Sequence, residues 1–127
     1  MFYRVAGQLV FQHRFLLERL ENPKWPQAIG RLRPVGGRPE PGESRFATLQ
    51  REFAEELGIV LTREMTPGNW RAVYEPQFKR LTWVIDVINH GLTPGRYDSP
   101  QPEHGDPYIR LVPVGLSWDG RQSERCY

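Results

Sequence analysis

The segment from Gly37 to Ile59, GRPEPGESRFATLQREFAEELGI, constrains this chain more than any other part of its sequence. A loop rich in glycine and proline leads directly into a stretch whose apolar residues recur every three or four positions. Ser44 suits a helix N-cap and Gly58 suits a left-handed C-terminal residue, so we expect a helix over about Arg45–Leu57. The apolar residues that would form its buried stripe are Phe46, Leu49, Phe53 and Leu57.

The opposite face of this predicted helix is acidic. Glu52, Glu55 and Glu56 lie at positions i, i+3 and i+4, where side chains are neighbours and like charges repel. Three converging carboxylates favour a cation between them, and oxygen-only ligands suit a hard divalent ion such as Mg²⁺ or Mn²⁺. Arg51 lies four residues before Glu55, so it can orient a carboxylate. Taken alone, the three glutamates would more often be a solvated helix face.

The loop before the helix changes that balance. Gly36 and Gly37 allow the backbone to approach a ligand closely, although by themselves they also suit an ordinary turn. We expect Gly37→Val to reduce activity more than stability. The loop would also carry Arg38 towards the carboxylates, where its guanidinium could bind a phosphate.

Nine residues of this segment fit the pattern G-x5-E-x7-R-E-U-x-E-E-x-G-U, in which U is a bulky apolar residue. They are Gly37, Glu43, Arg51, Glu52, Phe53, Glu55, Glu56, Gly58 and Ile59. The pattern resembles the signature of the Nudix family, whose members hydrolyse a pyrophosphate bond in a nucleoside diphosphate linked to another moiety. One difference lies just before it, because Val35 stands where the family often has proline.

The resemblance also implies roles for individual residues. Glu55 and Glu56 would be the main metal ligands, and Glu52 would be a further ligand or the general base. The carbonyl of Gly36 would be another ligand, Glu43 would support the site at the start of the helix, and Arg51 would orient the carboxylates. The implied cofactor is Mg²⁺, with Mn²⁺ as an alternative.

The segment Gly37–Ile59 is called the box below. Outside the box the sequence pattern is mainly that of strands, and together with the one strong helix this indicates a mixed sheet with helices on its faces. The resemblance implies the same fold class, an α/β/α sandwich, in a single domain over residues 1–127. The expected strands are Tyr3–Phe11, Arg14–Leu20, Trp70–Phe78, Leu81–Asn89 and Tyr108–Val114. A short last helix could begin near Asp119.

Two further features concern the substrate. The segment 91–107 is long enough to be a functional loop that supplies a base, with Glu103 as the candidate and His104 beside it, or to be a solvated connection. Tyr74 lies near the position of a tyrosine in the diadenosine-polyphosphate hydrolases of the family. The other aromatic residues that could stack on a base are Trp25, Trp70, Phe78, Trp83, Tyr97 and Tyr108, most of which should be core.

Composition limits the remaining possibilities. The 127 residues carry a net charge of +2, and no apolar run approaches the length of a membrane span. Cys126 is the only cysteine, so no internal disulfide can form, and a cytoplasmic location is compatible. We expect a small nucleotide as substrate, with nucleoside triphosphate housecleaning as one option, and a homodimer as one oligomeric state. The competing hypothesis is a catalytically idle nucleotide-binding or scaffold module, although the box has lost none of its glutamates.

Overall fold

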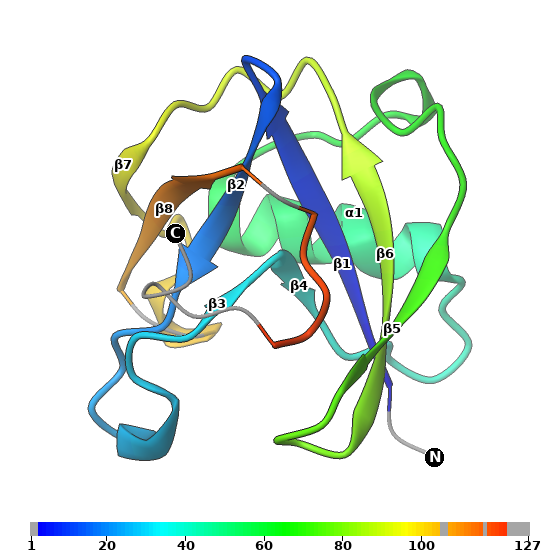
Figure 1. Cartoon of the computed structure of the whole chain (residues 1–127). Coiled ribbons are helices and arrows are strands. Elements are labelled where there is room, and N and C mark those ends of the chain that lie inside the picture. The colour runs from blue at the N-terminus through cyan, green and yellow to red at the C-terminus, as the bar shows by residue number, and fades with distance from the viewer. Residues whose placement is uncertain (1–2, 105–106, 116, 122–127) are drawn as a thin grey trace.

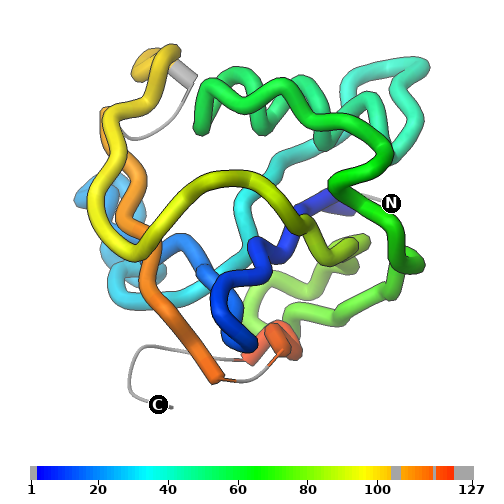
Figure 2. Tube along the Cα trace, turned by 90° about the horizontal axis from the view of Figure 1, so that it is seen from above, coloured from blue at the N-terminus to red at the C-terminus, as the bar shows by residue number. Residues whose placement is uncertain are grey.

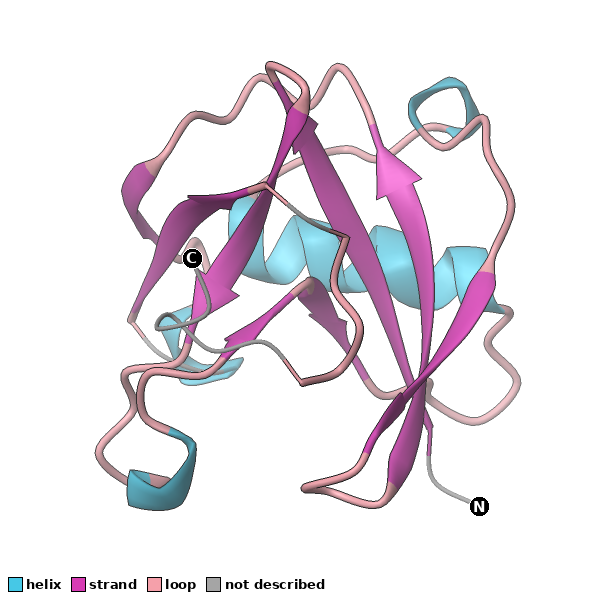
Figure 3. Cartoon of the chain, viewed as in Figure 1, coloured by secondary structure: helices cyan, strands magenta, loops and turns pink. Residues whose placement is uncertain are grey.

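The computed structural model describes residues 3–104, 107–115 and 117–121, and these form a mixed sheet with one long helix against it (Figures 1 and 3). The main path of the sheet runs in the order β5-β6-β1-β2-β8-β7, and β3 and β4 pair with β2 and β1. The strands are β1 (Tyr3–Phe11), β2 (Arg14–Arg19), β3 (Leu32–Arg33), β4 (Val35–Gly37), β5 (Arg71–Glu75), β6 (Arg80–Val87), β7 (Gly95–Asp98) and β8 (Tyr108–Val114). Helix α1 spans Arg45–Leu57, and three 3-10 turns are η1 (Pro26–Ala28), η2 (Arg63–Met65) and η3 (Pro102–His104).

Helix α1 has the boundaries that its capping residues predict. The Ser44 hydroxyl accepts a hydrogen bond from the Ala47 amide at 3.1 Å, and Gly58 ends the helix with a φ of 68°. Leu49 and Phe53 are fully buried against the sheet, and this fixes which face of α1 points away from the core. The glutamates on the opposite face are thereby directed towards the glycine loop.

The position of that loop follows from a divergence within the sheet. Strands β1 and β2 pair only near their connecting turn, from Leu9 to Phe11, and then separate. Strand β4 pairs with β1 through Val35–Gly37, while β3 pairs with β2 through Leu32–Arg33. The two short strands therefore occupy the gap between β1 and β2, and the chain leaves β4 directly beneath α1.

The sheet has a core on each face, and Figure 2 shows α1 on one side of β1 and the segment 117–121 on the other. Trp118 seals the second core together with Leu17, Leu32 and Val84. Its indole N–H donates to the Leu32 carbonyl at 3.0 Å, and its backbone amide donates to the Gln8 side chain at 2.9 Å. Trp118 is therefore bonded to β1 and β3 while it packs into the second core.

The comparison with the sequence predictions is close for the long elements. The mixed α/β fold class, the helix and the strands Tyr3–Phe11 and Tyr108–Val114 are confirmed, and the other three strands are shorter or shifted by a few residues at their ends. The predicted helix near Asp119 is wrong for residues 119–121, which are not helical, and the rest of it falls outside the described residues.

The segment 91–107 contains strand β7, which pairs with β8. No helix of the described residues is long and apolar enough to cross a membrane.

Candidate active site

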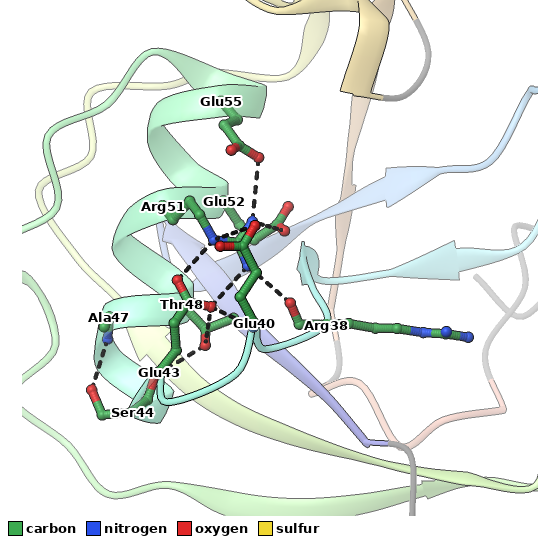
Figure 4. Close-up of polar contacts among 9 residues, drawn as sticks. All are labelled: Arg38, Glu40, Glu43, Ser44, Ala47, Thr48, Arg51, Glu52 and Glu55. Atoms are coloured by element: carbon green, nitrogen blue, oxygen red, sulfur yellow. Dashed lines mark hydrogen bonds and ion pairs between the residues drawn. The ribbon is translucent and has the colours of Figure 1, made fainter.

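Arg51 is the centre of a network of carboxylates on α1 and its preceding loop (Figure 4). Its guanidinium donates to both carboxylate oxygens of Glu43 at 2.8 and 2.9 Å. It also donates to Glu52 at 2.8 Å and, through a longer contact of 3.4 Å, to Glu55. The remaining bond goes to the backbone carbonyl of Arg38 at 2.9 Å. One side chain therefore ties the loop to two of the three acidic residues of the helix.

The pKa values of two carboxylates in this network, Glu43 and Glu52, are shifted in opposite directions. Hydrogen bonds from Arg51 hold the pKa of Glu43 down, to about 2, so this carboxylate stays ionised and keeps Arg51 in place. Burial raises the pKa of Glu52, although Arg51 partly offsets the effect. A carboxylate that is fixed by a cation but harder to ionise than usual is a reasonable proton acceptor at neutral pH.

Glu56 is the most unusual carboxylate. Its Oε2 atom is buried without a hydrogen-bond partner among the described residues. Burial raises its pKa well above the usual range, and the negative charges of Glu18 and Glu52 raise it further. An orphaned buried oxygen costs free energy unless a ligand satisfies it. Glu56 therefore has the environment expected of a residue whose partner is a bound cation.

The two glycines of the loop meet different neighbours. A Cβ added to Gly37 would overlap the carboxylate group of Glu52, whereas one added to Gly36 would overlap the backbone of β1 at Val5 and Ala6. Glycine at 37 thus makes room for a site side chain, and glycine at 36 allows two strands to approach. Figure 4 shows the Arg38 side chain pointing away from the Arg51 network, whereas the Arg38 carbonyl accepts a bond from Arg51.

A cavity of about 490 Å³ opens beside this network. It is lined by Glu56 and Arg38 of the box region, by Glu18 and Arg33 of the neighbouring strands, and by Trp25 on the turn at η1. The volume lies within the usual range of about 300–1,000 Å³ for small-molecule sites. The cavity connects the acidic face of α1 to the surface.

Two charged residues near this cavity, Glu18 and Arg4, were missed by the sequence analysis, whereas Arg33, which flanks the glycine loop, was expected to be able to bind a phosphate. Glu18 is only 5% exposed, and Arg33 contacts it at 3.5 Å. Arg4 is only 3% exposed, donates to the Pro34 carbonyl at 2.7 Å and leaves its Nη1 without a partner among the described residues. Burial lowers the pKa of Arg4 to about 9, with Arg33 adding to the effect. A signal was present for Glu18, since strand alternation puts it on the same face as the apolar Leu16.

Two of the predicted site residues, Tyr74 and Glu103, belong neither to the cavity lining nor to the network around Arg51. Tyr74 is 52% exposed on β5 and does not line the cavity. Glu103 is exposed in η3, a turn that packs against α1. The neighbouring Ser99 hydroxyl donates to the Glu55 carbonyl at 3.2 Å, so this segment is held beside the acidic helix. The His104 side chain and Asp106 fall outside the described residues.

The donor set fits a hard divalent cation in its chemistry. Glu52, Glu55 and Glu56 offer only oxygen, and the orphaned oxygen of Glu56 and the room at Gly37 fit such a ligand. Within residues 3–104, 107–115 and 117–121, however, no three acidic, histidine or cysteine side chains are already arranged around one point. The reason is visible in the ion pairs: Arg51 draws Glu52 and Glu55 to itself, so binding a cation requires these side chains to turn.

Comparison with known proteins agrees with this geometry. The NUDIX domain model matches residues 1–116. The chain belongs to the Nudix family. With its box intact, it is a Nudix pyrophosphohydrolase.

Solved structures share the fold of this Nudix chain. The solution structure of the E. coli ORF135 protein is 23% identical, with a TM-score of 0.54 over 90% of this chain and 73% of that one. A NUDIX hydrolase from Nitrosomonas europaea is 22% identical, with a TM-score of 0.55 over 88% and 70%. A bifunctional NMN adenylyltransferase/ADP ribose pyrophosphatase from Francisella tularensis, complexed with AMP and a Mn ion, is 17% identical, with a TM-score of 0.56 over 93% and 35%. No curated protein sequence matches this chain significantly.

Substitution of the two loop glycines should separate stability from activity. Gly36→Ala forces β4 away from the backbone of β1, so we expect it to lower the free energy of unfolding by about 1–3 kcal/mol. Gly37→Ala displaces only the flexible end of Glu52, and a misplaced catalytic group can cost on the order of 100-fold in rate. Urea unfolding and pyrophosphohydrolase assays check both. Equal losses of stability at the two positions would contradict this division.

Glu56→Gln should stabilise the metal-free protein increasingly as pH rises. Because the pKa of Glu56 is raised on folding, its contribution to stability is complete below about 4.5 and is lost as pH rises through the folded-state pKa. Glutamine stays neutral and avoids this loss. Thermal unfolding in EDTA at pH 4.5 and pH 8 measures the difference. Glu55→Gln is the matched control on the same helix, because it removes a contact with Arg51 and should not gain stability.

Proposed function

We propose that this chain hydrolyses the pyrophosphate bond of a nucleoside diphosphate linked to another moiety, using Mg²⁺ or Mn²⁺. The observation that carries this proposal is the buried oxygen of Glu56, which has no hydrogen-bond partner among the described residues. Glu52 and Glu55 lie on the same face of the helix and are paired with Arg51. The carboxylates of Glu52, Glu55 and Glu56 offer only oxygen atoms as ligands, which is the ligand type that these cations prefer. The Francisella neighbour, of which this chain matches 35%, is complexed with a Mn ion.

In the proposed site, Glu52, Glu55, Glu56 and the carbonyl of Gly36 would hold the cation. When bound, such an ion polarises phosphoryl oxygens and lowers the pKa of a coordinated water. Arg51 keeps its bonds to Glu43 and to the Arg38 carbonyl, so the loop and helix stay together when Glu52 and Glu55 turn. Glu43 is thus a support for the site and does not contact the reacting atoms.

The general base is the second part of the proposal. Glu52 is suited to accept a proton because burial raises its pKa, and its contact with Arg51 at 2.8 Å offsets that effect only in part. Glu103 is the alternative, on a turn packed against α1. The exposure of Glu103 favours Glu52, since an exposed carboxylate keeps water in its own shell and is not held in one place.

The substrate is a small nucleotide in this proposal. Nucleoside triphosphates are one option, since the cavity of about 490 Å³ is in the size range of sites for a single small ligand. The Francisella neighbour, of which this chain matches 35%, is complexed with AMP. A homodimer and a cytoplasmic location are parts of the same proposal. An idle scaffold is disfavoured, because the glutamates and the arginine of the box are all present.

Hydrolysis of a substrate panel tests this function. Nucleoside triphosphates, ADP-ribose, nucleotide sugars and dinucleoside polyphosphates are incubated with Mg²⁺, Mn²⁺ or EDTA, and the products are separated by chromatography. We expect cleavage with either metal and none in EDTA. Glu56→Gln should lower turnover by about 100-fold or more while the fold is retained, since even the indirect partners of a metal site cost 10–100-fold. Normal turnover by this variant would remove Glu56 from the site.

The pH dependence of Glu103→Gln decides between the two bases. If Glu52 is the base, the rate of this variant should rise with pH as in the original protein, and this is the outcome we expect. If Glu103 is the base, the rise should flatten. The profile of kcat against pH from 5 to 9 is the measurement, and Gln101→Ala on the same exposed segment serves as the control.

A further inference from the structure

We propose that Trp25 is the residue on which the substrate's base stacks, a specificity role that rests on the proposed function. Three observations lead to it: the depth of the cavity, the contacts of its aromatic rings and the bonding of the turn that carries Trp25. The proposal moves base recognition from Tyr74 on β5 to the turn at η1.

The cavity has a buried, charged side and an exposed, aromatic mouth. The buried side is lined by Glu56, whose Oε2 is inaccessible to solvent, and by Glu18, with Arg33 beside it. At the mouth lies Trp25, which is 59% exposed and is the largest exposed apolar side chain that lines the cavity. A nucleotide whose pyrophosphate reaches Glu56 would therefore extend its base towards the surface and the indole ring.

The other aromatic ring of the cavity is already occupied. Phe78 has the guanidinium of Arg31 at 5.2 Å from its ring centroid and that of Arg80 at 4.9 Å. Arg80 is itself held by an ion pair with the buried Glu75 at 2.5 Å. In the part of the chain that the structure describes, no cation lies over the Trp25 ring. Trp25 is thus the aromatic surface of the cavity that is available for stacking.

The backbone of Trp25 is fixed although its side chain is exposed. The Trp25 amide donates to the Asn22 carbonyl at 3.0 Å, and the Trp25 carbonyl accepts from Ala28 at 2.9 Å. The turn is also anchored next to the end of β2, because the Gly30 amide donates to the carbonyl of Leu20 at 2.8 Å. Gln77 donates to the Gln27 carbonyl at 3.4 Å, which links the turn to the β5–β6 hairpin across the mouth.

Figure 1 shows this arrangement from outside: the turn at η1 and the β5–β6 hairpin project from the same end of the sheet. A fixed backbone limits the positions that an exposed aromatic side chain can take, so less entropy is lost when a ligand stacks on it. Stacking of a base on an aromatic side chain is worth about 1–3 kcal/mol by alanine substitution, and every base has a face that can stack.

Binding measurements test the proposal without relying on turnover. Nucleoside diphosphates and inorganic pyrophosphate are titrated in Mg²⁺ by calorimetry. We expect Trp25→Ala to weaken the binding of nucleoside diphosphates by roughly 5- to 150-fold and to leave the binding of inorganic pyrophosphate unchanged. Trp25→Phe should retain most of the affinity because it keeps an aromatic face. Circular dichroism checks that each variant is folded.

The matched control is Ile29→Ala, which removes a 53% exposed apolar side chain from the same turn without touching the cavity lining. Equal affinities for Trp25→Ala and Ile29→Ala would overturn the proposal. So would an equal loss of pyrophosphate binding, or a loss for Tyr74→Ala in place of Trp25→Ala. If the original protein hydrolyses no member of the substrate panel, the proposed function itself fails. Hydrolysis that proceeds equally well without Trp25 refutes only the stacking role.

Discussion

The hydrogen bonds of Arg51 are the interaction on which the candidate active site depends. Without the guanidinium, Glu52 and Glu55 would repel each other on the surface of α1, and Glu43 would keep only its bonds from the Glu40 amide and the Thr48 hydroxyl. The guanidinium offsets part of the negative charge and also bonds to the Arg38 carbonyl, so one side chain acts on both the electrostatics and the loop geometry. Arg51 is therefore both a counter-ion and a structural link.

The arrangement also explains why the site is not assembled in advance. Carboxylates paired with Arg51 are stable, whereas Glu56 is left with an unsatisfied oxygen in a buried position. The free-energy cost of a buried, unpartnered oxygen thus falls on Glu56, and a bound cation would remove it. Binding of the cation is favoured by this gain at Glu56 and opposed by the loss of the ion pairs that Glu52 and Glu55 make with Arg51.

Much of this could be predicted from sequence, because the decisive signals are local. Ser44 and Gly58 define α1 within one turn of each end, and the spacing of its glutamates fixes which of them are neighbours. Short strands such as β3 and β4 could not be predicted, since they exist only through pairing with β2 and β1. The buried charges of Glu18 and Arg4 depend on the divergence of those strands. Tyr74 and Trp25 could not be told apart, because only the folded chain shows which ring faces the cavity.

The position of Trp118 has a consequence for how this protein is made. Its backbone amide is bonded to Gln8, 110 residues earlier in the chain, and its indole covers Leu17 and Leu32. During synthesis these apolar residues leave the ribosome long before the residue that covers them. The second core must therefore stay open to water until Trp118 has been synthesised, and the contact that closes it is among the most distant in sequence of the described residues. Such long-range closure slows folding, and apolar surface that is exposed in the meantime favours aggregation.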